Sequence, residues 1–207
     1  MDVEATLAAV RRRYEEWLAE HGPESPRAVG TADAALQKVR FDVLALVMEG
    51  EEPVSVADFG CGTGALFAHL AARAAPPPVG AYTGYDLVPG MVAAARATID
   101  DPRARFVVAS EVLEDADYVL ASGALSIRPG VGDEEWAAHV RDVLRGLWAR
   151  ARRGLAFNLL PRAADPDVFV ADPVEWERFC LRELPNSRVA LLQGPPLVDF
   201  SVLVRRQ

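Results

Sequence analysis

Cysteine is scarce in this chain, in which Cys61 and Cys180 are the only two among 207 residues. Two cysteines cannot form the disulfide framework that holds small secreted domains together. Histidine is almost as scarce, and none of the three histidines has carboxylates beside it at the spacing of metal ligands. The sequence therefore predicts neither a disulfide-stabilised domain nor a metal site.

Long apolar runs are also missing. No apolar stretch approaches the roughly 20 residues that a membrane-spanning helix needs, and the first residues form an acid-containing amphipathic stretch instead of a signal peptide. The formal net charge is −8 and the sequence pI is near 5.0, which disfavours a nucleic-acid backbone as the main partner. We therefore expect a cytoplasmic chain with no membrane partner and no nucleic-acid partner.

Hydrophobic spacing divides the chain into alternating helices and strands. Asp133 and Gly154 are expected to cap the two ends of a long helix between them. Strands separated by helices predict an α/β fold in which a parallel sheet is covered on both faces. The predicted helices cover residues 1–20, 33–48, 65–75, 90–99 and 134–150, with one more from 173, and the predicted strands cover 54–59, 81–85, 106–109, 118–121, 155–160, 189–193 and 198–204.

The end of the chain departs from this alternation. Only residues 194–197 join the last two predicted strands, whereas a parallel crossover needs a dozen or more residues. The last strand is therefore expected to run antiparallel, in a hairpin. The length suits one globular unit, which we divide into an N-terminal helical cap over residues 1–50 and a core over residues 51–207.

The segment Val56–Gly64, VADFGCGTG, links the first predicted strand to a helix. Its glycines let the backbone turn tightly and approach a ligand closely, because no Cβ intervenes. The spacing G-x-G-x-G separates it only weakly from a dinucleotide-binding loop. Asp58 separates the two better, because a carboxylate beside the phosphate position would repel a pyrophosphate but suits a ligand with an ammonium group.

Asp86 ends the next predicted strand, in the sequence Tyr82–Asp86. A carboxylate at this place can accept hydrogen bonds from both hydroxyls of a ribose, a feature shared by nicotinamide and adenosyl ligands. The plainer alternative is a helix cap or a turn residue.

The residues above resemble those of the class I S-adenosylmethionine-dependent methyltransferases. This family implies a Rossmann-like, seven-stranded, mostly parallel sheet with an antiparallel last strand and helices on both faces. It also implies an enzyme that uses S-adenosylmethionine (SAM) as its cofactor. The segments that carry the likeness are Val56–Gly64, Tyr82–Met91 and Asp117–Gly123, and a likeness to a subgroup of small bacterial methyltransferases adds Gly30, Gln37, Arg40, Phe41, Asn158 and Asp199–Ser201.

The resemblance also implies the cofactor-binding residues. Gly60, Cys61, Gly62 and Gly64 belong to the loop that passes under the methionine and ribose parts, and Asp58 meets the ammonium group. Asp86 holds the ribose hydroxyls, Leu87 lies against the adenine, Ser122 lies near the methionine part, and Arg40 is matched to the carboxylate. Relatives often carry an aspartate after the third strand, where this chain has Ser110 and Glu111, so either of these is expected to contact the adenine amino group.

No catalytic residue is assigned from the sequence, although three side chains are candidates. His21 follows the first helix, where a general base would suit a closing lid. Tyr14 either faces the sulfonium or the acceptor, or packs as a helix-core aromatic. Asn158 ends the fifth predicted strand, where it either hydrogen-bonds an acceptor or ties a loop.

The leading interpretation is transfer of a methyl group from SAM to a nitrogen or oxygen of a small molecule. An oxygen acceptor more often needs a base than an amine does, so the lack of a clear base favours nitrogen slightly. A nicotinamide-dependent oxidoreductase and a non-catalytic cofactor-binding scaffold are the alternatives. Asp58 and the terminal hairpin disfavour the oxidoreductase, and the sequence leaves the oligomeric state open.

Overall fold

The computed structural model describes residues 3–31 and 33–207, and the strands in this part of the chain form one seven-stranded sheet. The strands are β1 (Val54–Phe59), β2 (Val79–Asp86), β3 (Ala104–Val108), β4 (Ala116–Ala121), β5 (Ala151–Leu159), β6 (Ser187–Gln193) and β7 (Phe200–Arg206). The helices are α1 (Val3–His21), the short 3-10 helix η1 (Pro26–Val29), α2 (Ala34–Ala45), α3 (Ala65–Ala72), α4 (Pro89–Thr98), α5 (Asp133–Arg150) and α6 (Pro173–Glu183).

The sheet has the strand order β3-β2-β1-β4-β5-β7-β6. The pairs from β3 to β5 are parallel, and β7 runs antiparallel to both β5 and β6, which confirms the predicted hairpin and the predicted fold class. The chain leaves β1 toward β2 but reaches β4, on the other side of β1, only after β3. Ligands of open α/β sheets bind outside the carboxyl ends of the strands at such a reversal of strand order.

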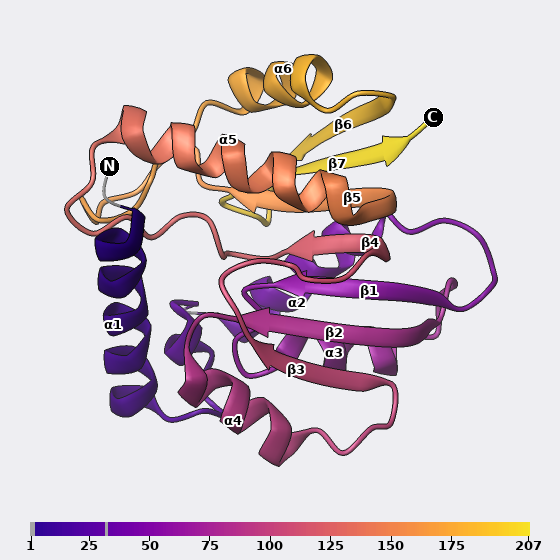
Figure 1. Cartoon of the computed structure of the whole chain (residues 1–207), viewed down its shortest axis with the longest axis horizontal. Coiled ribbons are helices and arrows are strands. Elements are labelled where there is room, and N and C mark those ends of the chain that lie inside the picture. Colours follow the sequence, from indigo (N-terminus) through magenta and orange to yellow (C-terminus); the bar gives the residue numbers. More distant parts are fainter. Residues whose placement is uncertain (1–2, 32) are drawn as a thin grey trace.

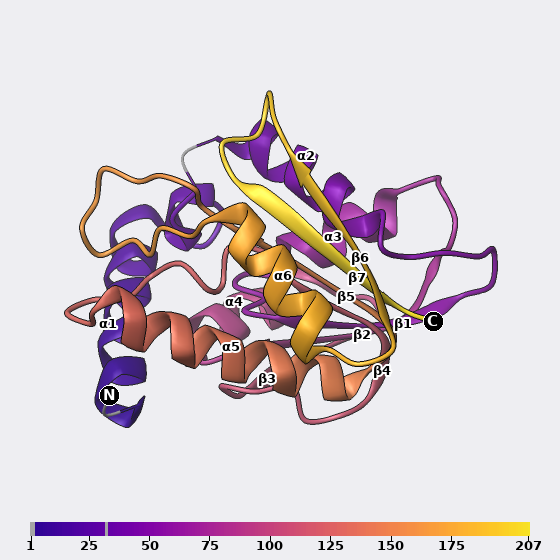
Figure 2. The same ribbon diagram turned by 90° about the horizontal axis from the view of Figure 1, so that it is seen from above.

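Helices cover both faces of the sheet. Figure 2 shows α5 and α6 on one side of the strands and α2 and α3 on the other. The strands serve both layers because successive side chains point to opposite faces. In β4, Val119 packs in the core beneath α5 and α6, whereas Tyr118 and Leu120 pack in the core beneath α2, α3 and α4.

Helix α1 takes a different position and lies across the carboxyl ends of the parallel strands (Figure 1). Its Val10 joins the core beneath α5, and Arg13 Nη2 donates to Asp167 Oδ2 over 2.6 Å, which ties the helix to the segment after β5. The stretch after α1, which lies between the first two predicted helices, contains η1, whose first turn is capped by the Ser25 hydroxyl. These contacts place α1 over the switch point between β1 and β4.

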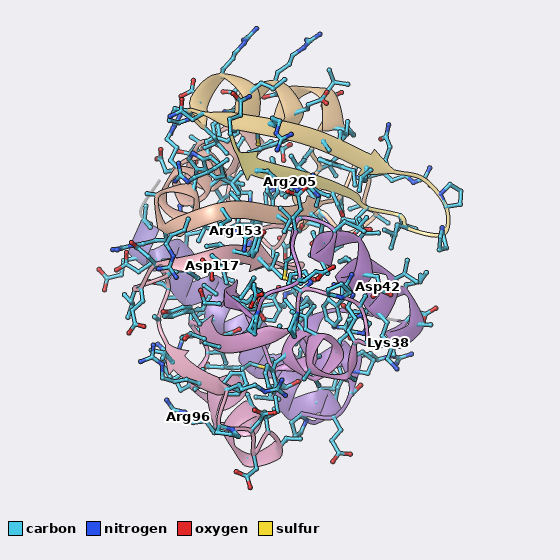
Figure 3. The ribbon with its side chains drawn as sticks, turned by 90° about the vertical axis from the view of Figure 1, so that its right-hand side faces the viewer. Lys38, Asp42, Arg96, Asp117, Arg153 and Arg205 are labelled. Atoms are coloured by element: carbon cyan, nitrogen blue, oxygen red, sulfur yellow. The ribbon has the colours of Figure 1, made fainter. Side chains whose placement is uncertain are left out.

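Arginines bind the segment after α2 at the amino ends of the parallel strands, opposite to α1. Arg205 Nε donates to the Val47 carbonyl over 3.0 Å and Arg153 Nη2 donates to the Glu49 carbonyl over 2.7 Å, just beyond the end of α2. Carbonyls at the end of a helix lack intrahelical partners, so these bonds fasten α2 to the sheet. Figure 3 shows Arg205 and Arg153 near Asp117 on this side of the molecule.

Two predicted helix caps are wrong. Asp133 is the first residue of α5, and Gly132 occupies the cap position before it. Gly154 lies inside β5, where a Cβ would come within 2.9 Å of Val47 Cγ2. This glycine serves close packing between β5 and the segment after α2, a tertiary contact that a local reading of the helix end does not include.

Candidate active site

The loop between β1 and α3 has the backbone that only glycine adopts readily. Gly60 and Gly62 have φ angles of +74° and +52°, in the left-handed region that a Cβ disfavours. A Cβ on Gly60 would lie 2.5 Å from the Ala124 Cβ, and a Cβ on Gly62 would lie 2.7 Å from Val29 Cγ1. The two glycines therefore let the loop pack closely against Val29 and Ala124, and neither position has space for a side chain.

Asp58 is a buried carboxyl group at the end of β1, with 2% of its surface exposed. The Tyr82 hydroxyl donates to its Oδ2, and its Oδ1 has no hydrogen-bond partner among the described residues. Burial raises the pKa of Asp58 to about 7, and the nearby Asp86 adds to this effect while the Tyr82 bond opposes it. A buried carboxyl oxygen without a partner is costly, so the site suits a ligand that brings a donor.

Asp86 ends β2 and binds the glycine loop directly. Its Oδ2 accepts from the Gly62 backbone N–H over 2.8 Å, and its Oδ1 accepts from the Val88 N–H over 2.9 Å. Burial raises the pKa of Asp86, and these two bonds lower it in part. A carboxylate has about four acceptor positions, so two backbone bonds leave room for further donors. Asp86 is thus also a turn residue, as the plainer alternative had it.

Two hollows meet at the glycine loop and share Val29, Gly60, Gly62, Ser122 and Gly123 in their walls. The first, which we call the polar hollow, is also lined by Thr31, Gln37, Arg40, Phe41, Asp58, Cys61, Thr63, Ala65 and Leu66. The second, which we call the apolar hollow, is also lined by Leu7, Val10, Tyr14, Phe59, Asp86, Leu87, Met91, Ala109, Ser110, Leu125, Trp136, His139 and Val143. The polar hollow, which contains the charged side chain of Arg40, and the apolar hollow therefore border the same glycine loop.

The predicted cofactor-binding residues are distributed over both hollows. Arg40 and Cys61 line the polar hollow, while Leu87 and Ser110 line the apolar one. Glu111 is exposed and lines a neighbouring hollow together with Ser110. Burial raises the pKa of the Cys61 thiol, and this side chain packs against Gly84, where a Cβ would lie 2.8 Å from the sulfur. Cys61 is therefore a small packing residue of the loop. Gly64 caps the start of α3 at the end of the loop.

The three catalytic candidates have different surroundings. Tyr14 lines the apolar hollow, and burial together with the nearby Asp86 raises the pKa of its hydroxyl. Asn158 is 3% exposed and is bonded on both sides of its amide, to the Gly123 N–H and to Asp199, so it ties a loop. His21, a described residue at the end of α1, lines neither of the two hollows.

His139 and Trp136 of α5 are wall residues that sequence reasoning did not assign to the site. Their rings are 5.0 Å apart, and residues three apart on a helix share a face. The spacing of the predicted helix could therefore have indicated His139 as a wall residue, because His139 lies on the same face as the buried Trp136. Burial lowers the pKa of His139, so its ring is neutral at neutral pH.

No helix within 3–31 and 33–207 is long and apolar enough to cross a membrane. In the same part of the chain, no group of three or more histidine, cysteine, aspartate or glutamate side chains is placed to hold a metal ion.

A reversed β7 beside β5, a glycine loop at the β1–β4 switch point and an acidic residue ending β2 define the class I SAM-dependent methyltransferase fold. Comparison with known proteins agrees. Residues 56–147 match the methyltransferase domain family. Rv1506c of Mycobacterium tuberculosis, a protein assigned as a methyltransferase, is 37% identical over 166 residues, covering 77% of this chain and 98% of the relative. The chain belongs to the class I SAM-dependent methyltransferases.

Solved structures share the fold at low sequence identity. Magnesium protoporphyrin IX methyltransferase from Synechocystis PCC 6803, with bound S-adenosylhomocysteine (SAH), has a TM-score of 0.67 and 14% identity over 95% of this chain and 99% of that chain. CalS10, an amino pentose methyltransferase from Micromonospora echinaspora with bound SAM, has a TM-score of 0.62 and 15% identity over 86% of this chain and 93% of that chain. The chain is an enzyme that uses SAM, and the oxidoreductase and scaffold alternatives are set aside.

Proposed function

We propose that the enzyme methylates a nitrogen or oxygen of a small molecule that enters the apolar hollow between α1 and α5. The observation that carries this proposal is the composition of the walls. Leu7 and Val10 of α1 face the same hollow as Trp136 of α5 and Leu125. Small-molecule sites are mostly apolar and have few polar groups, and here Tyr14 and His139 are the polar side chains that reach the hollow from these helices.

The polar hollow supports the assignment of the cofactor's amino-acid part. The buried Asp58 Oδ1 has no partner among the described residues, which fits an ammonium donor. Arg40 lines the same hollow, and a guanidinium matches a carboxylate in shape and charge. Gly60, Gly62, Ser122 and Gly123 border the same hollow, so the residues present fit the group.

The adenosine part is assigned to the walls of the apolar hollow that Asp86, Leu87 and Ser110 form, and the acceptor to the walls that α1 and α5 form. Asp86 has acceptor positions left for the ribose hydroxyls, and Leu87 offers an apolar surface to the adenine. Ser110 replaces the expected aspartate next to the adenine edge, and Glu111 beside it is exposed. We therefore favour Ser110 for the adenine amino group. Ser122 lines both hollows and is assigned to the point where cofactor and acceptor meet.

The residues of the chain act by holding and orienting the reactants. SAM supplies, when bound, an activated methyl group. Alignment and exclusion of water can lower a barrier by roughly 7–11 kcal/mol in favourable cases, and Leu7, Val10 and Tyr14 of α1 form one wall of the hollow. The Tyr14 hydroxyl keeps its proton because its pKa is raised, so it can serve as a hydrogen-bond donor to a molecule in the apolar hollow. The neutral His139 ring can serve as a hydrogen-bond acceptor for the same molecule, because its pKa is lowered. An amine acceptor needs no stronger base than this.

Three further predictions stay open. The division into a cap over residues 1–50 and a core over 51–207 is a proposal: α1 covers the hollow, whereas Phe41 and Leu44 of α2 pack in the core beneath the sheet. A cytoplasmic location and the absence of a nucleic-acid partner rest on composition, with a net charge of −8.

The test is transfer of a labelled methyl group. The purified enzyme is incubated with methyl-labelled SAM and a bacterial extract that is afterwards separated into small molecules, protein and nucleic acid. We expect label among the small molecules, where mass spectrometry identifies the acceptor atom. An Asp86→Ala variant, which removes the proposed ribose contact, is the control and should transfer little. Label in protein or nucleic acid, or no transfer at all, would contradict the proposal.

A further inference from the structure

A chain of buried polar contacts runs from α2 to the loop after β4. Arg40 Nε and Asp199 Oδ2 are 2.5 Å apart. Asn158 Nδ2 donates to the same Asp199 oxygen over 2.6 Å, and Asn158 Oδ1 accepts from the Gly123 N–H over 2.8 Å. Asp199, just before β7, and Asn158 of β5 thus join α2 to the loop after β4.

The contacts are buried. The Asp199 side chain is fully buried and that of Arg40 is 14% exposed. Asp199 Oδ1 and Ser201 Oγ have no hydrogen-bond partner among the described residues. Apolar residues of similar volume often stabilise a core as well as a buried ion pair does. Stability alone is therefore a weak reason for an incompletely satisfied carboxylate at this place.

The bond to Asp199 fixes the orientation of the Arg40 guanidinium. Its Nε is held by Asp199, so the other edge of the guanidinium, formed by the two Nη atoms, is left for another partner. Arg40 lines the polar hollow together with Asp58. Its Nη1 lies 3.8 Å from the point where a Cβ on Gly123 would stand, beside the Ser122–Gly123 backbone that borders both hollows.

We propose that Asp199 is a positioning residue, which holds the Arg40 guanidinium with its Nη edge toward the carboxylate of the cofactor. Asn158 fastens the same aspartate to the Gly123 backbone, so the carboxylate end of the cofactor and the loop that borders the acceptor share one support. This inference rests on the proposed function, because it takes Arg40 as the carboxylate contact. It assigns to Asp199 and Asn158 an indirect role.

The experiment compares two ligands by calorimetry: SAH and 5′-methylthioadenosine, which lacks the amino-acid part. The ratio of their dissociation constants isolates that part. Arg40→Met should reduce the preference for SAH about tenfold or more, as expected for a lost charge-assisted bond. Asp199→Ala should reduce it by a similar factor. Asp199→Asn should keep it within about threefold, because the amide oxygen still accepts from Arg40 Nε.

A structural role alone would weaken both ligands equally and leave the ratio unchanged. Asp117→Ala is the matched control, because Asp117 accepts from the Ser55 N–H and hydroxyl, both over 2.8 Å, at the opposite edge of the sheet. It should lower the melting temperature and not the ratio. The structure of the wild-type enzyme with SAH gives an independent test, in which Arg40 Nε should stay on Asp199 while its Nη atoms meet the ligand carboxylate.

The outcomes separate the two proposals. If wild-type enzyme binds 5′-methylthioadenosine as tightly as SAH, or Arg40→Met leaves the ratio unchanged, the assignment of Arg40 is wrong. If Arg40→Met lowers the ratio while Asp199→Ala does not, or if Asp199→Asn loses as much as Asp199→Ala, the positioning role is overturned and the cofactor assignment stands. A complex in which Arg40 leaves Asp199 overturns it as well, even where Asp199→Ala does not fold.

Discussion

The affinity for SAH should depend on pH through Asp58. Burial raises the pKa of this carboxyl to about 7 from an ordinary value of 3.8. An ammonium group placed at the unpartnered Oδ1 favours the carboxylate form, because an opposite charge at close range lowers the pKa of an acid. Binding at acidic pH therefore requires Asp58 to lose a proton. The same raised pKa means that Asp58 contributes stability to the free protein below about pH 4, which is lost as the pH rises through about 7.

The size of the effect follows from the protonated fraction. With a pKa of about 7, Asp58 is about nine tenths protonated at about pH 6 and about one tenth protonated at about pH 8. The dissociation constant of SAH should therefore be about tenfold higher at about pH 6 than at about pH 8, or ~1.4 kcal/mol in binding free energy. About one proton should be released for each SAH bound at about pH 6.

Calorimetry in two buffers of different ionisation enthalpy measures both quantities. Asp58→Asn is the control, because its amide oxygen still accepts from Tyr82 but does not titrate. The variant should bind SAH more weakly at about pH 8, by roughly 1.5–3 kcal/mol for a hydrogen bond to a charged group, and show a flat pH profile. An identical pH profile in the wild type and the variant, or no proton release near about pH 6, would refute the reasoning.

Three further predictions concern Asp86 at the end of β2, the glycine loop and the start of α6. Asp86→Ala should abolish most of the thermal stabilisation by SAH, which for the wild type is about 2.7 kcal/mol at 100 times the dissociation constant; normal binding by calorimetry would remove the ribose assignment. Gly60→Ala should destabilise the fold by roughly 1–3 kcal/mol in urea unfolding, because its Cβ would lie 2.5 Å from that of Ala124 and φ is +74°, whereas Gly146→Ala in α5, with nothing within 4 Å, should stabilise it by roughly 0.5–1 kcal/mol; equal effects would contradict the steric argument. Asp172→Ala should cost about 1 kcal/mol, because its side chain accepts from the Glu175 N–H at the start of α6; an unchanged urea midpoint would show that this cap contributes nothing.

The amino-acid sequence alone predicts the layered fold and the two acidic positions of the site. Alternating helix and strand patterns predict a parallel sheet, and the short 194–197 connection permits only a hairpin. Asp58 and Asp86 end neighbouring parallel strands, whose carboxyl ends meet at one edge. These predictions were accessible because they depend on short segments and on general rules of chain connection.

Which distant side chains meet depends on the packing of the whole chain. Asn158 had two possible roles, and the choice depends on Asp199, which lies 41 residues further along the chain. Arg40 and Asp199 are 159 residues apart and meet because α2 packs beneath β5 and β7. Helical spacing already puts His139 on the same face as Trp136, but only the packing of α5 on the sheet brings that face to the hollow. Contacts of this kind depend on strand order, register and helix packing together, and no local pattern contains them.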